Sequence, residues 1–353
     1  MKLVICCMFF SILGIAGHSQ HSHYLGNNHR VSPLFEEEKL LKIFLNYSKK
    51  DILESTNDST YIWSSLSYQK EDKSLETIKI QIRARGNFRK QYCYYLPLKI
   101  KIKKELSQAT IFREDKKLKL VLPCLDSYKS NDHVVKEFLA YKIFELISPY
   151  HFETKLLSIQ FKEKRNRKTI DHDLLGIFIQ DDDQIALLNN GKMIKRNIHP
   201  QAQDTLGSSR NALFQYMIGN TDFSIAYRHN EKLLLVDDKI VPIPYDFDMS
   251  GFVNSSYAVV SAINNRALPI ATVTERLFRG FERGDLVLEE TRREFLNYED
   301  AIYKLLDQHK IYFKDPQEFL ECKKYVESFY DIIKDDKKFQ KKILQKQRKS
   351  LLE

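Results

Sequence analysis

Glycine and proline are scarce in this chain, with 11 and 9 residues among 353, so a collagen-like or low-complexity sequence is excluded. Aromatic residues are plentiful by contrast, with 19 tyrosines and 22 phenylalanines. At 43% hydrophobic residues, a chain of this length can bury a substantial core, and the length suggests about two lobes or domains. We therefore expect a globular protein.

Long apolar runs are missing after the first twenty residues. Residues 1–20 contain Lys2, an apolar run over 3–16 and then small residues, which is the pattern of a secretory signal peptide. Its apolar part is too short for a membrane span, so we expect a mature chain without a span, exported to the periplasm, the exterior or the cell surface. A lipoprotein is less favoured, because Cys6 and Cys7 lie early in the apolar run.

Cysteine is also rare, and beyond the first twenty residues only Cys93, Cys124 and Cys322 occur. An odd number allows at most one bridge among them, and Cys93 and Cys124 could equally well pair or remain buried thiols. No Cys/His spacing typical of a metal site is present. The net charge of +9 is spread along the chain without a nucleic-acid motif, so DNA and RNA are not expected as partners.

Periodicity divides the chain into a strand-rich part and a helical part. Residues 21–38 are polar and aperiodic and are expected to form an N-terminal arm. Alternating residues predict a mostly antiparallel, β-rich N-lobe over 39–182, with one inserted helix at 132–147. Beyond it the pattern predicts a mainly helical C-lobe over 183–353, interrupted by a hairpin at 232–243. The predicted fold class is therefore α+β.

Acidic residues on both sides of this hairpin are the strongest functional signal. Asp222 is followed eight positions later by Asn230, and Asp246 and Asp248 interrupt an apolar run just after the hairpin. Hard divalent cations prefer carboxylate and amide oxygens, and paired carboxylates repel unless a cation or proton intervenes. We therefore predict metal ligation by Asn230, Asp246 and Asp248, while Asp222 would accept a hydroxyl proton or orient the nucleophile. Ordinary turn residues are the plainer interpretation.

Basic residues in the strand-rich part offer a phosphate-binding side. Arg83, Arg85 and Arg89 lie where a strand meets a turn, Gly86 permits a tight backbone there, and arginine forks suit phosphate oxygens. An ordinary basic hairpin tip is the alternative. Kinases also use a strand lysine held by a helix glutamate, for which Lys99 and Glu137 are the candidates.

Taken in order, these motifs resemble the spore-coat CotH family of atypical, kinase-like proteins. The resemblance covers about residues 39–257 and is far more specific than any one motif. It rests on Arg83-Ala-Arg-Gly-Asn87, Lys99 in a Pro-Leu-Lys strand, the helix at 134–147, Gly176-Ile-Phe-Ile179, Gly219-Asn-Thr-Asp222 with Asn230, and Pro244-Tyr-Asp-Phe-Asp248.

The resemblance implies a two-lobed protein-kinase-like fold, ATP with Mg²⁺ or Mn²⁺, and transfer of the γ-phosphoryl group to Ser/Thr hydroxyls of a secreted or surface protein. It implies that Asp222 is catalytic, that Asn230 and Asp246 ligate the metal and that Asp248 assists them. It also implies that the turn of Arg85, Gly86 and Asn87 borders the nucleotide.

The chain departs from a kinase pattern in its phosphate-binding segment. Neither a Gly-x-Gly-x-x-Gly loop nor a Gly-x-x-x-x-Gly-Lys-Ser/Thr loop occurs, and Gln180 stands where an acidic residue is expected. ATP is also scarce outside the cytoplasm. An active exported kinase is preferred, and the alternatives are a kinase-like scaffold or surface binding protein without catalysis and a phosphotransferase acting on a small molecule or glycan.

Overall fold

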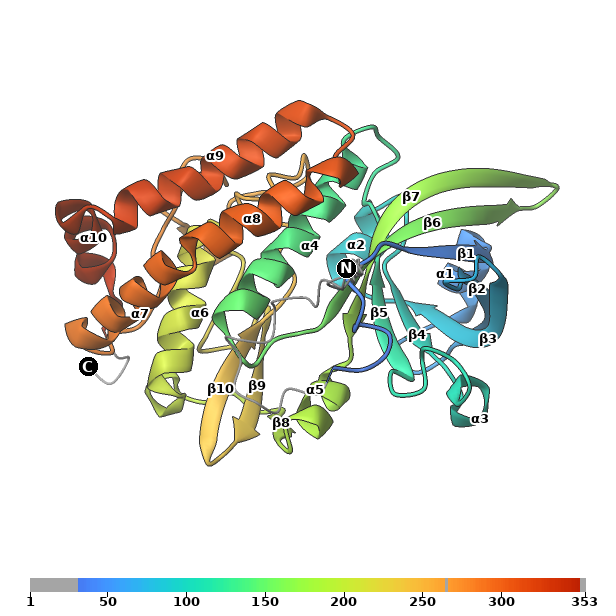
Figure 1. Cartoon of the computed structure of the whole chain (residues 1–353), viewed down its shortest axis with the longest axis horizontal. Coiled ribbons are helices and arrows are strands. Elements are labelled where there is room, and N and C mark those ends of the chain that lie inside the picture. Colours follow the sequence, from blue (N-terminus) through green and yellow to red (C-terminus); the bar gives the residue numbers. More distant parts are fainter. Residues whose placement is uncertain (1–30, 264–265, 350–353) are drawn as a thin grey trace, which may run out of the picture.

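A computed structural model describes residues 31–263 and 266–349 of the chain (Figure 1). The signal peptide predicted over 1–20 and most of the polar segment that follows lie outside the described residues. Within the described part, we find no helix with the length and apolar character needed to cross a membrane.

Seven strands in the first half of the chain close into a barrel (Figure 1). The strands neighbour one another in the order β1-β2-β3-β4-β5-β7-β6. Apolar side chains at alternate positions point into the barrel and form a buried core of their own, because successive strand residues face opposite sides. The strands are β1 (Leu41–Tyr47), β2 (Ile62–Gln69), β3 (Leu75–Ala84), β4 (Leu98–Lys101), β5 (Lys117–Val121), β6 (Thr154–Arg165) and β7 (Lys168–Gln180).

The predicted two-lobed protein-kinase-like fold, with an antiparallel sheet as its N-lobe, is wrong. β1 runs parallel to β6, with register partners from Leu41 opposite Leu157 to Tyr47 opposite Glu163, and this pairing closes the sheet on itself. Alternation along a strand indicates which side chains are buried, but it does not indicate which distant strand is the partner. A mixed closed barrel therefore replaces the open sheet that the pattern suggested.

Helices pack beside the barrel, and α4 (Ser130–Ile147) is the element that joins the two parts (Figure 1). It contacts β6 and β7 on one side and α8 on the other, and it is buried on nearly every face. Three short helices lie in connections between barrel strands: α1 (Lys49–Ser55), α2 (Asn87–Tyr92) and α3 (Lys104–Ser107).

The second half of the described chain contains a small sheet and most of the helices. The sheet has three strands in the order β10-β9-β8. Its strands are β8 (Lys192–Ile194), β9 (Glu231–Val236) and β10 (Lys239–Pro244), and β11 (Ala262–Ile263) pairs separately with β12 (Arg266–Ala267). The helices are α5 (Asp182–Leu188), α6 (Thr205–Met217), α7 (Asp285–Asn297), α8 (Glu299–His309), α9 (Pro316–Ile333) and α10 (Asp336–Lys342), with 3-10 turns at Pro200–Ala202, Lys310–Tyr312 and Leu344–Lys346.

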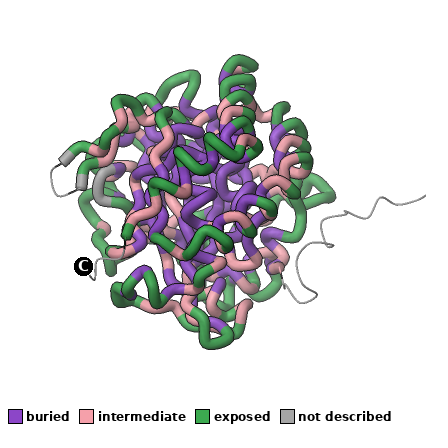
Figure 2. Tube along the Cα trace, turned by 90° about the vertical axis from the view of Figure 1, so that its left-hand side faces the viewer, coloured by how far each residue is buried: buried purple, intermediate pink, exposed green. Residues whose placement is uncertain are grey.

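Two large apolar clusters hold these parts together. One fills the barrel, and the other includes α4, α6, the β9–β10 hairpin and the C-terminal helices. Buried residues are concentrated in the middle of the molecule, and exposed residues cover its outside (Figure 2). Leu156, Ile177 and Ile179 belong to the second cluster although they lie on barrel strands, so the outer face of β6 and β7 packs on the helical part.

Cys93 and Cys124 form a disulfide, which resolves the alternatives left open by the sequence. Cys93 directly follows α2, and its N–H donates to the Arg89 carbonyl at 2.9 Å. The bridge therefore ties the end of α2 to the segment between β5 and α4. Cys322 is a buried free thiol whose pKa is raised to about 12 by burial.

Candidate active site

The β9–β10 hairpin brings two acidic loops together. Asn230 immediately precedes β9 and Tyr245 immediately follows β10, and the Tyr245 N–H donates to the Asn230 carbonyl at 3.1 Å. The loop 218–230, which leaves α6, therefore meets the loop 245–248 at one end of the hairpin.

Asp222 lies in a set of short hydrogen bonds within the first loop. The Asn230 side-chain amide donates to the Asp222 carbonyl at 2.6 Å and to its Oδ2 at 3.0 Å, and His229 Nε2 lies 3.1 Å from its Oδ1. Burial alone would raise the pKa of Asp222, but the hydrogen bonds from His229, Ser261 and Asn230 and the charge of His229 lower it. Asp222 is therefore a partly exposed carboxylate whose ionised form is favoured by its neighbours.

Asp246 and Asp248 both contact the guanidinium of Arg89. Arg89 Nη2 lies 2.6 Å from Asp248 Oδ2 and 3.6 Å from Asp246 Oδ1. Asp248 also accepts a bond from Arg89 Nε at 3.0 Å and one from the Tyr257 hydroxyl at 3.0 Å, whereas the Asp246 side chain is 34% exposed. Asp246 has a positive φ of 66°, and its N–H donates to the Tyr141 hydroxyl at 2.8 Å.

Glu137 is paired with Arg89 and not with the predicted strand lysine. Arg89 Nη2 lies 3.3 Å from Glu137 Oε2, while Lys99 Nζ lies 3.3 Å from Asp181 Oδ2 on the barrel surface. Burial raises the pKa of Glu137 to about 8, against the charge of Arg89. Its Oε1 is buried and makes no hydrogen bond to any described residue. Burial therefore favours the neutral form of Glu137, while the contact with Arg89 favours the ionised form.

Sequence reasoning gave Arg89 less weight than it has in the structure. The residue belongs to the basic segment around Gly86, but several arginines and lysines of that segment were equally plausible phosphate ligands. Arg83 instead points away, with Nη1 3.2 Å from Asp58 Oδ1. Gly86 precedes α2 with a φ of 76°, which favours glycine. Asn87 begins α2, and its side chain lies outside what the structure describes.

Lys119 of β5 and Lys232 of β9 lie against the Tyr245 ring, with their Nζ atoms 5.4 Å and 5.1 Å from its centroid. Burial raises the pKa of Tyr245, while the charges of Lys232 and Arg85 oppose that increase. Asp182 bridges Lys119, at 2.5 Å, and Lys232, at 2.8 Å. Several cations therefore surround the Tyr245 ring, next to the loop that carries Asp246.

The predicted metal ligands Asn230, Asp246 and Asp248 do not form a preassembled carboxylate site. Among the described residues, the one group of three or more His, Cys, Asp or Glu ligand atoms within 4.8 Å of one another is Glu145, His151 and Glu153. Lys142 Nζ lies 2.6 Å from both oxygens of Glu145, so a cation already sits in that cluster. Metal at the predicted site would depend on Asp246, on the Asn230 amide oxygen and on water.

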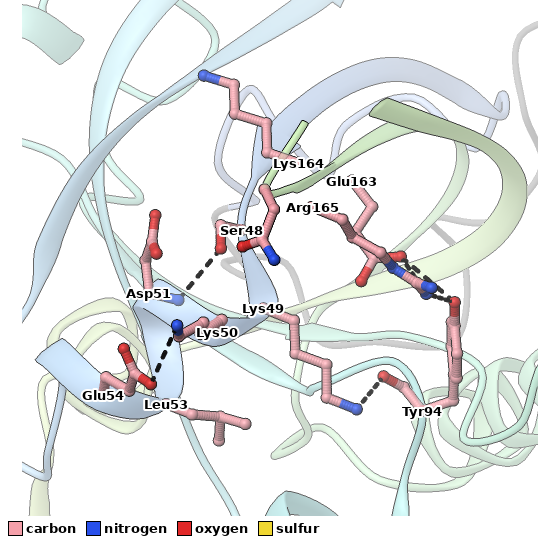
Figure 3. Close-up of a pocket in the computed structure, with 11 residues that line it drawn as sticks. Ser48, Lys49, Lys50, Asp51, Leu53, Glu54, Tyr94, Glu163, Lys164 and Arg165 are labelled. Atoms are coloured by element: carbon pink, nitrogen blue, oxygen red, sulfur yellow. Dashed lines mark hydrogen bonds and ion pairs between the residues drawn. The ribbon is translucent and has the colours of Figure 1, made fainter. Parts of the chain in front are cut away.

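A cavity of about 790 Å³ lies away from these residues, between α1 and the β6–β7 hairpin (Figure 3). Its charged groups largely satisfy one another: Arg165 pairs with Glu163 at 2.8 Å, and Lys49 Nζ donates to the Tyr94 carbonyl at 2.8 Å. Since its lining includes none of the predicted catalytic or metal-binding residues, we give the convergence of Asp222, Asn230 and Asp246 more weight than cavity size.

Comparison with protein-family models and with curated proteins gave no match for this chain. The resemblance to the CotH family therefore remains a prediction from its motifs.

Proposed function

We propose that this chain is a metal-dependent phosphotransferase that moves the γ-phosphoryl group of ATP to Ser/Thr hydroxyls of an exported or surface protein. The observation that carries the proposal is the meeting of Asp222, Asn230 and Asp246 at one end of the β9–β10 hairpin, opposite the cations Arg85 and Arg89. The proposal depends on these contacts and not on a kinase-like fold.

Asn230 and Asp246 are the residues that would hold the divalent cation. The Asn230 amide nitrogen donates to Asp222, so its oxygen is the atom left to act as a ligand. Asp246 is partly exposed, and its contact with Arg89 is the longest that Arg89 makes to a carboxylate. Mg²⁺ and Mn²⁺ bind such oxygens while keeping several waters, and bound there they would neutralise phosphate charge.

Asp222 would take the proton of the acceptor hydroxyl. Its pKa lies below the usual value, so the carboxylate is ionised at neutral pH, and Asn230 and His229 fix the orientation of its two oxygens. Arg85 would meet the phosphates as a positively charged donor. The attacking oxygen would lose its proton to Asp222 as the bond to phosphorus forms and the nucleotide diphosphate leaves.

A binding protein without catalysis is the second candidate, and Arg89 is the observation that favours it. The guanidinium already neutralises Asp248 and contacts Glu137, as in a purely structural buried ion pair. Transfer to a small molecule or glycan would use the same site and differ only in the acceptor.

The deciding experiment compares the exported chain with Asp222→Asn and Asp246→Asn in the presence of labelled ATP and Mg²⁺ or Mn²⁺, with protein and sugar acceptors offered separately. Both variants are expected to lose transfer. Asp238→Asn removes the same charge from the exposed hairpin turn, where Asn tolerates the positive φ of 58°, and is expected to keep it.

Nucleotide binding gives a second readout that does not need the acceptor. Ligand at about a hundred times its dissociation constant adds roughly 2.7 kcal/mol of apparent stability. A melting shift without transfer to any acceptor would favour the non-catalytic binding protein, and the absence of both would contradict the proposal.

A further inference from the structure

We infer that Arg89 occupies the position of a second cation in this site, so that the protein binds one divalent ion, through Asp246 and Asn230, and not two. This inference rests on the proposed function and specifies its metal requirement. Three carboxylates approach one guanidinium nitrogen: Arg89 Nη2 lies 2.6 Å from Asp248, 3.3 Å from Glu137 and 3.6 Å from Asp246.

The contacts of Asp248 differ from those of a residue that awaits a metal. Its Oδ2 accepts from Arg89 Nε, at 3.0 Å, and from the Tyr257 hydroxyl, at 3.0 Å, in addition to the ion pair with Nη2. Its side chain is buried, and its backbone carbonyl accepts from the Ser255 hydroxyl at 2.7 Å. A divalent ion at Asp248 would have to displace these donors and lie beside a guanidinium of the same charge sign.

The backbone around Arg89 holds the guanidinium in this place. α2 begins after Gly86, whose positive φ sets the direction of the helix, and ends at Cys93, which is bridged to Cys124. The guanidinium is buried together with Glu137 and Asp248. Arg89 is thus a built-in cation, fixed by the fold.

Asp246 remains as the carboxylate for an exchangeable ion. It keeps a partly exposed side chain, and its neighbour Tyr245 is hydrogen-bonded to Asn230, which holds the two oxygen ligands in adjacent segments. Glu137 contacts Arg89 through Oε2, and its buried Oε1 makes no hydrogen bond to a described residue, so we expect a water and not an ion to be its partner.

The test counts Mn²⁺ ions bound per chain without nucleotide, from the electron paramagnetic resonance signal of free aqueous Mn²⁺. The wild-type protein is expected to bind one ion and Asp246→Asn none. Arg89→Met, which keeps an unbranched buried side chain but removes the charge, is expected to bind two. Arg83→Met is the matched control, because that arginine pairs with Asp58 away from the site, and it is expected to bind one.

Each possible ion count supports or overturns the inference. Two ions in the wild type, or one in folded Arg89→Met, would overturn the inference and leave the proposed function standing. No specific ion in the wild type, or one that persists in Asp246→Asn, would overturn the metal assignment in the proposed function as well. If Arg89→Met does not fold, Asp248→Asn decides instead: retention of the single ion supports the inference, and its loss overturns it.

Discussion

Asp222 and Asp248 lie on adjacent loops of one site but in opposite environments. Asp222 is partly exposed, and its bonds to His229, Ser261 and Asn230 lower its pKa. Asp248 is buried, and burial raises its pKa despite the charge of Arg89. Aspartate is thus a partly exposed carboxylate with a lowered pKa in one loop and half of a buried ion pair in the other.

The difference follows from the parts of the fold that supply the partners. Asp222 takes His229 and Asn230 from its own loop and Ser261 from 39 positions away, whereas Asp248 meets Arg89, 159 positions away in the chain. A charge pair within one loop can rearrange with that loop. A pair that joins the barrel to the hairpin is expected to resist rearrangement, and this difference can be measured.

Removal of Arg89 is expected to have the largest effect on stability. Arg89→Met leaves Asp248 buried without its charge partner, and the loss of one member of a buried pair costs about 3–5 kcal/mol. Denaturant unfolding measures this directly. Arg83→Met removes a pair whose partner Asp58 is exposed, and it is expected to cost about 0–1 kcal/mol. Equal losses in the two variants would contradict the contrast between buried and exposed pairs.

Glu137 should make stability depend on pH in a predictable direction. Burial raises its pKa from 4.5 to about 8, so the folded protein keeps a proton that the unfolded chain releases. The resulting stabilisation is complete below about pH 4.5 and disappears as the pH rises to about 8, with a slope of about 1.4 kcal/mol per pH unit. Above that range it contributes nothing further.

Glu137→Gln removes this proton and should flatten the curve over that range. The measurement is the free energy of unfolding at several pH values for the variant and the wild type. Exposed Glu54→Gln is the control and is expected to follow the wild type. Parallel curves for wild type and Glu137→Gln would show that Glu137 is ionised in the folded protein.

The sequence was informative where structure is local. Periodicity predicts a helix at 132–147 and a hairpin at 232–243, and the structure has α4 at Ser130–Ile147 and the hairpin of β9 (Glu231–Val236) and β10 (Lys239–Pro244). Closure of the barrel was not predicted. It depends on the pairing of β1 with β6, in which Leu41 lies opposite Leu157, and a local pattern does not indicate so distant a partner.

Some features of the candidate site were also predicted from the sequence, and others were not. Asp246 and Asp248 interrupt an apolar run, which correctly indicated carboxylates in need of a compensating charge. The group that supplies this charge is distant in the sequence and could not be identified from the local pattern. In the structure it is Arg89 of α2. Lys99 occupies an alternating strand position like other lysines of the barrel. The residue type alone could not show whether its partner is Glu137 or, as in the structure, Asp181.

Removal of His229 is expected to have the smallest effect, and only within a limited pH range. Burial opposes the charged form of Asp222, but its partners lower its pKa below 3.8, so the stabilisation from Asp222 is lost as the pH falls through that lowered value. The hydrogen bond to Asp222 raises the pKa of His229 above 6.5, so the stabilisation from His229 is complete below 6.5 and is lost as the pH rises through the raised value. The pair therefore contributes fully between pH 3.8 and 6.5.

Because the imidazole is more than half exposed, His229→Gln should cost about 0–1 kcal/mol at a pH within that range, less in high salt, and less at pH 9, because the positive charge of the imidazole is lost as the pH rises. Unfolding of both proteins at the two pH values measures the difference. A loss as large as that of Arg89→Met, or one that is not smaller at pH 9, would show that the Asp222 loop is as firmly fixed as the arginine-centred cluster.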